Sequence, residues 1–71
     1  MNWEQIESNW ERFRPIVGLY WSKITEGQLD WVHGKRERLV ETIQAAYRMS
    51  HGNADRQLAN WQESRQRESE L

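Results

Sequence analysis

The stretch that decides the fold is Trp3–Phe13, with the sequence WEQIESNWERF. Its large apolar residues recur at intervals of three, four and three positions, at Trp3, Ile6, Trp10 and Phe13. Because an α-helix has about 3.6 residues per turn, this spacing places all four side chains on one face of a helix. A helix with one apolar face must bury that face against another element. The stretch therefore predicts an amphipathic helix that packs against the rest of the chain.

Capping residues mark the start of this helix, and a proline marks its predicted end. Asn2 is a favoured N-cap residue, and Gln5 stands three positions later, where its amide can return a hydrogen bond to the cap backbone. Pro15 cannot donate an intrahelical hydrogen bond and disfavours a helical conformation at Arg14, so we expect the first helix to end or kink there. Proline suits the first turn of a helix, which predicts a second helix over residues 15–23. The pattern leaves open whether the two helices form one kinked rod.

Three further apolar patterns predict three more helices. The first follows a capping box at Thr25–Gln28 and ends near Gly34. The second has a two-column apolar face over Lys35–Tyr47, and the third is a shorter face over Ala54–Trp61. No alternation typical of β-strands occurs between them. The predicted fold class is all-α, a compact bundle of four to five short helices arranged as paired α-hairpins.

The apolar pattern stops at Trp61, which predicts the end of the folded domain. Residues 62–71 contain one apolar residue, Leu71, so we expect them to form a polar, disordered tail. The helical domain is therefore predicted over residues 1–61. A chain of 71 residues has room for one small core, and five Trp, two Tyr and one Phe are available to fill it.

The composition argues against several classes of protein. There is no cysteine for a disulfide or for a thiolate metal site. Ten Lys and Arg against eleven Asp and Glu give a net charge of −1, which provides no general attraction to nucleic acid or to anionic membranes. No apolar run approaches the roughly 18 residues that span a bilayer, and the polar N-terminus lacks the features of a secretory signal. We expect a cytoplasmic protein with no membrane contact, cofactor or small-molecule substrate.

Three segments carry a family resemblance: MNWEQIESNW at residues 1–10, YWSKITEGQLDWVHGKRERLVETIQAAY at residues 20–47, and ADRQLANW at residues 54–61. The most specific run is GKRERLVETIQ at residues 34–44. Together these segments resemble the bacterial CsbD-like (YjbJ-type) family across residues 1–61. The resemblance implies a compact bundle of four or five short helices and an association with general stress responses. It implies no established activity, so it assigns no catalytic residues.

One segment, RPIVGLY at Arg14–Tyr20, is more apolar than the resemblance implies, because family members tend to be rich in glycine and lysine there. On a helical wheel centred on Val17, Trp21 and Ile24, Tyr20 lies at the edge of the buried face, Ile16 lies further round, and Leu19 points nearly opposite that face, so we expect Leu19 to be exposed with Ile16 beside it. Trp31 has two interpretations: a half-buried residue at a helix junction, or an exposed aromatic anchor for a partner. Ile16, Leu19 and Trp31 are the candidate interaction surface, for an unknown protein partner or for self-association.

Three cations, Lys35, Arg36 and Arg38, follow Gly34 where a helix is expected to begin. Cations are disfavoured at the positive end of a helix dipole, so this cluster is a candidate anion-binding site for phosphate, a carboxylate or nucleic acid. The alternative is that the preceding helix continues through Gly34 and leaves the cations on an ordinary solvated face, which is commoner for charge runs. The near-neutral net charge also makes nucleic acid an improbable partner.

The remaining polar residues point to no metal site and no catalysis. His33 and His51 are eighteen positions apart and have no cysteine partners, so we expect them at helix ends and not in a metal site. No nucleophile elbow or glycine-rich phosphate loop occurs, so we expect no enzyme. A hydrophilic protectant would fit the mean hydropathy of −1.07, but such a protein is disordered, whereas five Trp predict a core. The leading hypothesis is a non-enzymatic protein-interaction module, and anion binding is the alternative.

Overall fold

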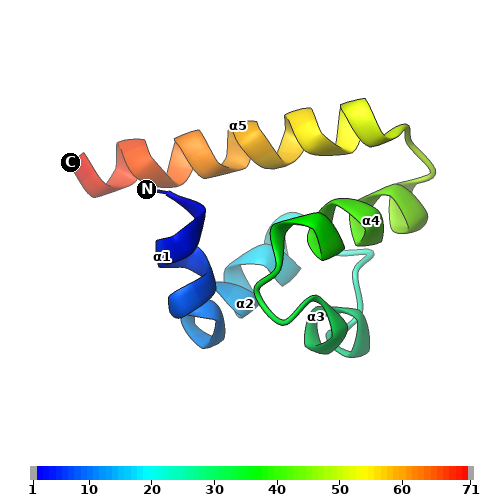
Figure 1. Ribbon diagram of the computed structural model, residues 1–71, viewed down its shortest axis with the longest axis horizontal. Coiled ribbons are helices and arrows are strands. Elements are labelled where there is room, and N and C mark those ends of the chain that lie inside the picture. The colour runs from blue at the N-terminus through cyan, green and yellow to red at the C-terminus, as the bar shows by residue number, and fades with distance from the viewer. Residues whose placement is uncertain (1, 71) are drawn as a thin grey trace.

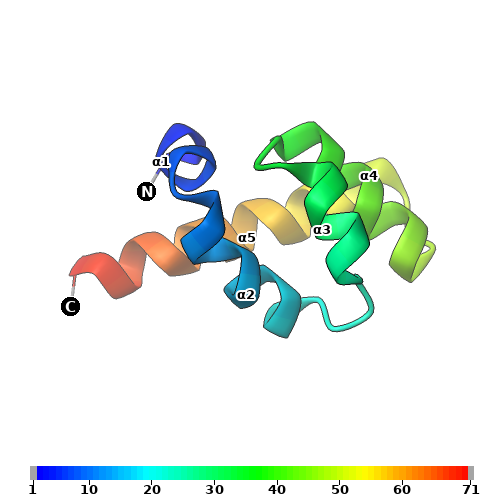
Figure 2. The same cartoon turned by 90° about the horizontal axis from the view of Figure 1, so that it is seen from below.

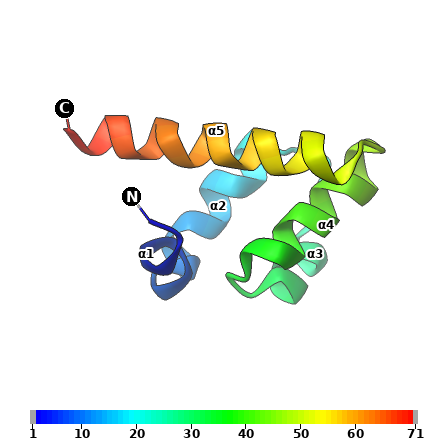
Figure 3. The same ribbon diagram turned by 45° about the horizontal axis from the view of Figure 1, so that its top comes forward.

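The computed structural model describes the backbone of residues 2–70 and the side chains of residues 2–64. In that range the chain forms five helices and no strand, which confirms the predicted all-α class. The helices are α1 (Trp3–Ser8), α2 (Trp10–Tyr20), α3 (Glu26–Val32), α4 (Arg36–Tyr47) and α5 (His51–Glu70). Helix α5 lies along one side of the molecule, and the four shorter helices pack beneath it (Figure 1). In Figure 3, α2 and α4 lie next to each other beneath α5.

The first two helices are separated at Asn9, and the prediction of a break at Pro15 is wrong. Asn9 has φ −115° and ψ 34°, outside the helical region, and its backbone N–H donates to the carbonyl oxygens of Gln5 and Ile6 at 3.2 Å. Its side-chain Nδ2 also donates to the Gln5 carbonyl at 2.8 Å. The non-helical backbone of Asn9 interrupts the chain between α1 and α2. The two helices therefore run in different directions (Figure 2) and do not form one kinked rod.

Pro15 lies inside α2, in its second turn, so the predicted helix over residues 15–23 is also corrected. Proline removes one hydrogen bond from a helix interior, here the bond to the carbonyl of Glu11. The apolar face of α2 is buried on both sides of the proline, at Trp10, Phe13 and Val17. The burial of that continuous face keeps the helix intact through Pro15.

The two predicted capping boxes are present. At the start of α1, Asn2 Oδ1 accepts from the Gln5 backbone at 3.0 Å, and Gln5 Oε1 accepts from the Asn2 backbone at 3.3 Å. At the start of α3, Thr25 and Gln28 form the same reciprocal pair at 3.2 and 2.8 Å. These four hydrogen bonds satisfy backbone donors that have no partner inside the helix.

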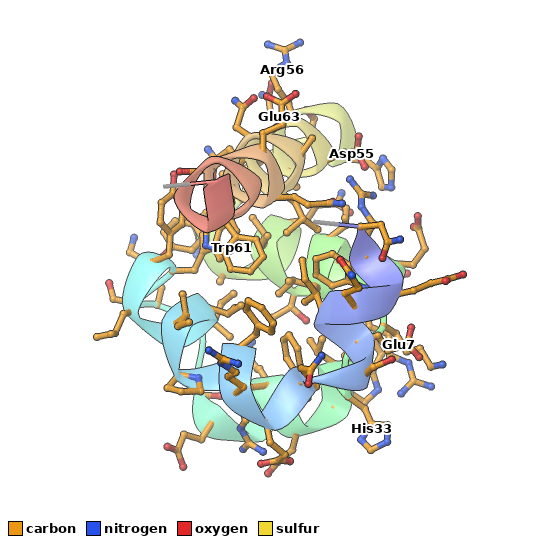
Figure 4. The ribbon with its side chains drawn as sticks, turned by 90° about the vertical axis from the view of Figure 1, so that its left-hand side faces the viewer. Glu7, His33, Asp55, Arg56, Trp61 and Glu63 are labelled. Atoms are coloured by element: carbon orange, nitrogen blue, oxygen red, sulfur yellow. The ribbon has the colours of Figure 1, made fainter. Side chains whose placement is uncertain are left out.

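The core is a single cluster of buried apolar residues with Trp61 near its centre. The ring centroid of Trp61 lies 5.8 Å from that of Trp21 and 6.4 Å from those of Phe13 and Trp3. In Figure 4, Trp61 points from α5 into the bundle, whereas Arg56 and Glu63 of the same helix point away from it. The core consists of Ile6, Trp10, Phe13, Val17, Trp21, Ile24, Leu29, Val32, Leu39, Val40, Ile43, Ala54, Leu58 and Trp61.

The turn between α3 and α4 is fastened to α1. His33 and Gly34 adopt positive φ angles of 47° and 79°, which end α3 as predicted. The Gly34 carbonyl accepts a hydrogen bond of 2.8 Å from Trp3 Nε1, and an added Cβ at Gly34 would lie 3.0 Å from Glu7 Cγ. Glycine is required here both for the left-handed backbone and for the close approach to α1.

Helix α5 continues as backbone to Glu70, beyond the end of the apolar pattern at Trp61. The side chains of Glu63 and Ser64 are exposed, in agreement with the loss of the apolar face. The side chains of residues 65–71 lie outside the described residues, so the disordered tail over 62–71 stays a prediction. Over the described range, the helices are too short or too polar to serve as a bilayer span.

Candidate functional site

The outer face of α2 carries an apolar strip of the exposed residues Leu19 and Tyr20 with the half-buried Ile16, which we call the α2 strip. Leu19 is 84% exposed, which confirms the orientation given by the helical wheel. Tyr20 is 60% exposed, and Ile16 is half-buried against the core. Residues three or four positions apart are neighbours on a helix surface, so Ile16 lies next to both other members of the strip.

A groove of about 600 Å³ lies between α2 and α3, next to the α2 strip, and we call it the α2–α3 groove. Leu19 forms part of its wall, so the most exposed leucine of the described residues stands at the edge of a concave surface. The buried side chains of Ile24 and Leu29 contribute apolar surface to it. The full lining is Glu11, Arg14, Pro15, Gly18, Leu19, Ile24, Glu26 and Leu29.

The charges at the groove leave an acidic rim. The guanidinium of Arg14 pairs with Asp30 and donates to the backbone carbonyl of Glu26 at 3.2 Å, so its positive charge is already neutralised. Among the described side chains, Glu11 and Glu26 form no ion pair. An apolar floor with an acidic rim favours an occupant that has an apolar anchor and nearby cations.

Gly18 lines the groove in the middle of α2, where glycine weakens a helix by about 0.5–1 kcal/mol relative to alanine. A Cβ at this position would lie 3.5 Å from Leu29 Cδ1, an ordinary van der Waals distance, so internal packing does not require the glycine. We therefore expect Gly18→Ala to stabilise the protein by about 0.5–1 kcal/mol in urea unfolding monitored by Trp fluorescence. A loss of stability would show that the internal packing needs glycine at this position.

Trp31 lies apart from the other two predicted surface residues. It is 51% exposed on α3, and it lines a second groove of about 500 Å³ between α3 and α4. The Arg38 guanidinium lies 5.2 Å from the Trp31 ring centroid, and Arg38 Nη1 donates to the Trp31 carbonyl at 3.0 Å. Leu19 and Ile16 belong to α2, so the three predicted residues do not form one continuous patch.

The predicted cation cluster is divided among three internal partners. Lys35 Nζ lies 2.7 Å from Glu7 Oε2, and Arg36 Nη1 lies 2.6 Å from Asp55 Oδ1. Arg38 contacts Trp31, as described above. The alternative of a helix that continues through Gly34 is not found, because α3 ends before it and α4 begins at Arg36. An anion at this cluster would have to compete with contacts that already hold α1, α4 and α5 together.

The Arg36–Asp55 pair gives a prediction that pH titration can test. Hydrogen bonding and the positive charge of Arg36 hold the pKa of Asp55 below its ordinary value. Because the native pKa is lowered, the pair stabilises the fold above the ordinary Asp pKa, and this stabilisation is lost as the pH falls through the native pKa. We expect an NMR titration of Asp55 to show a low midpoint that rises in Arg36→Gln. An unchanged midpoint in the variant would mean that Arg36 does not control this carboxyl.

Both histidines lie at helix ends, as predicted. His33 is the C-cap of α3, and His51 is the first residue of α5, with Nε2 3.7 Å from Glu37 Oε2. Within residues 2–64, no three or more His, Asp and Glu side chains are grouped in a way that could hold a metal ion.

Sequence reasoning missed the acidic rim of the α2–α3 groove and the exposure of Tyr20. Glu26 reaches the groove because α3 packs against α2, a contact that no local pattern contains. Tyr20 was expected at the edge of the buried face and is instead largely exposed.

Comparison with curated proteins finds similar small bacterial proteins. UPF0337 protein YjbJ of Escherichia coli is 31% identical over 62 residues, which cover 87% of this chain and 90% of the relative. UPF0337 protein ECA0631 of Pectobacterium atrosepticum is 32% identical over 63 residues, covering 89% of this chain and 91% of the relative. UPF0337 protein NE2439 of Nitrosomonas europaea is 36% identical over 58 residues, and the match spans 82% of this chain but 62% of the relative. No family model and no solved structure matches the chain.

Proposed function

The chain belongs to the UPF0337 family, the CsbD-like family, and on that basis we propose that it is a non-enzymatic, cytoplasmic interaction domain that docks a protein partner through the α2–α3 groove during the stress response. The link to stress rests on the family resemblance. The docking role rests on the surface of α2.

The single observation that carries the proposal is Leu19, 84% exposed at the edge of the groove. Complete burial of a leucine side chain contributes about 1.5–3 kcal/mol, so Leu19 offers a substantial anchor to any partner that covers it. The neighbouring exposed Tyr20 extends the apolar surface, and tyrosine is among the residues most enriched at binding hot spots. Leu19 makes little contribution to the core, so its side chain is free to make a contact outside the fold.

Two features of the groove favour docking over catalysis. Its lining contains no serine, histidine or lysine that could act as a nucleophile or as a base poised near neutral pH. Its one cation, Arg14, is occupied by Asp30 and by the Glu26 backbone. The anion-binding alternative receives less support, because Lys35, Arg36 and Arg38 each have an internal partner.

Site-specific photo-cross-linking in living bacteria tests the proposal. A photoreactive phenylalanine analogue replaces Leu19, and a matched control carries it at Ala59, an exposed position on α5. We expect the Leu19 probe to give a discrete covalent product that survives nuclease and grows in stressed cells, while the Ala59 probe gives none. Filling the groove with Gly18→Leu in the same chain should remove the product. Equal product patterns from the two positions, or a product that nuclease destroys, would overturn the docking role.

A further inference from the structure

We propose that the occupant of the α2–α3 groove is a second copy of this chain, in a two-fold symmetric dimer in which Leu19 of each copy enters the groove of the other. This inference rests on the proposed function, because both use the same groove. It adds the identity of the partner, which the docking role alone leaves unspecified.

The first argument is that each copy presents both halves of the contact. Leu19 protrudes from α2, and the groove that could receive a leucine lies directly beside it. A two-fold interface uses the same patch on both copies, so a protrusion next to a matching recess is the arrangement that closes on itself. Each copy then buries its own Leu19 in the groove of its partner.

The second argument is charge complementarity. The rim of the groove carries Glu11 and Glu26, which form no ion pair among the described residues. Two cations stand near the α2 strip in the sequence: Arg12 lies one turn before Ile16 on α2, and Lys23 lies in the turn that follows the end of α2 at Tyr20. Neither cation forms an ion pair with a described residue, and Lys23 Nζ lies 5.4 Å from the Tyr47 ring centroid. Each copy therefore carries both an acidic groove rim and cations that are unpaired among the described residues, and in a dimer the cations of one copy would face the acidic rim of the other.

The third argument is Gly18. It lies beside Leu19 on α2 and lines the groove, yet a Cβ there would make only an ordinary contact with Leu29. The monomer gains no packing from this glycine, although glycine weakens a helix. A small residue where two helices cross lets them approach closely. A second copy whose α2 crosses at Gly18 would therefore give a reason for a glycine at this position.

The expected dimer is weak. The contact comprises one helix face and a groove on a chain of 71 residues, which places it near or below the low end of specific interfaces, about 1,200 Å² in total. A net charge of −1 provides little repulsion between copies. We expect a dissociation constant in the range of about 10–100 μM, with every contact made twice because of the two-fold symmetry.

Sedimentation equilibrium of the purified full chain, from about 1 μM to 1 mM, tests the proposal against that expected range. We expect a monomer–dimer equilibrium in the wild type and in Trp31→Lys, the matched control on a different surface. We expect Leu19→Lys to raise the dissociation constant at least tenfold while its helical circular dichroism is retained. A monomer at every concentration, or a dimer that persists unchanged in Leu19→Lys, would overturn the proposal.

A charge-swapped pair tests the complementarity separately. One variant carries Glu11→Lys and Glu26→Lys, and the other carries Arg12→Glu and Lys23→Glu. Each should be monomeric alone because like charges meet across the interface, and an equal mixture should form a one-to-one dimer. A mixture that stays monomeric while the wild type dimerises would show that these charges do not meet across the contact.

The two proposals fail in distinguishable ways. If the protein is monomeric in the centrifuge but the Leu19 probe captures a different protein in cells, the dimer is excluded and the docking function stands. If the captured product has twice the mass of the chain, the second copy is the partner. If the chain is monomeric and the Leu19 probe captures nothing, both proposals are excluded.

Discussion

Trp61→Ala is expected to remove about 3–5 kcal/mol of stability and to move the unfolding transition to a much lower urea concentration. Trp61 is 2% exposed, and its ring meets those of Trp3, Phe13 and Trp21 at centroid distances of 5.8–6.4 Å. A domain of 71 residues has a total stability of about 4–11 kcal/mol, at roughly 0.05–0.15 kcal/mol per residue, so one such loss consumes much of it. Urea unfolding followed by far-ultraviolet circular dichroism measures the change.

Trp31→Ala is the matched control for Trp61→Ala. Trp31 is 51% exposed and its ring lies against Arg38 at the surface, so we expect a loss below about 1 kcal/mol. Equal losses in the two variants would contradict a core centred on Trp61.

Gly34→Ala is expected to lower stability by about 2–3 kcal/mol, or the melting temperature by about 10–20 °C for a domain of this size. Gly34 has a φ of 79°, where a side chain is strained. The added Cβ would also lie 3.0 Å from Glu7 Cγ and 3.3 Å from Glu7 Cα. Relief of that contact would displace α1 and weaken the 2.8 Å hydrogen bond from Trp3 Nε1.

Gly52→Ala is the control for this second prediction. Gly52 lies near the start of α5, and no atom within 4 Å would contact an added Cβ. We expect no loss of melting temperature, and a small gain from the better helix propensity of alanine. If Gly34→Ala melts at the same temperature as Gly52→Ala, the turn between α3 and α4 does not depend on glycine.

Local patterns predicted the parts of the fold that local chemistry determines. The capping boxes at Asn2 and Thr25 form because their hydrogen bonds join residues three positions apart. The break between α1 and α2 lies at Asn9 and not at the predicted Pro15, because the two residues act on the helix in different ways. Pro15 loses one hydrogen bond inside a helix with a well-buried face, whereas the Asn9 side chain bonds the Gln5 carbonyl and competes with the helical backbone.

The candidate site was predictable only in part, because it depends on contacts between helices as well as on the pattern within one helix. The exposure of Leu19 follows from its position on the helical wheel. The groove beside it requires the packing of α3 on α2, which brings Glu26 and Leu29 to Gly18 and cannot be read from a single helix. The partners of Lys35 and Arg36 likewise lie 28 and 19 positions away in the chain, so a pattern of adjacent cations could not reveal that both are paired.

The claim that Leu19 serves binding and not folding is tested most directly by one cross-linking comparison. A photoreactive side chain at Pro15, on the wall of the groove, reports occupancy of the α2–α3 groove in cells, with and without Leu19→Lys. Leu19→Lys should lower the yield of covalent product at least tenfold, while its unfolding free energy stays within about 0.5 kcal/mol of wild type, as is usual for exposed positions. An unchanged yield, or an equal drop when the lysine is placed at Ala59, would contradict a docking role for Leu19.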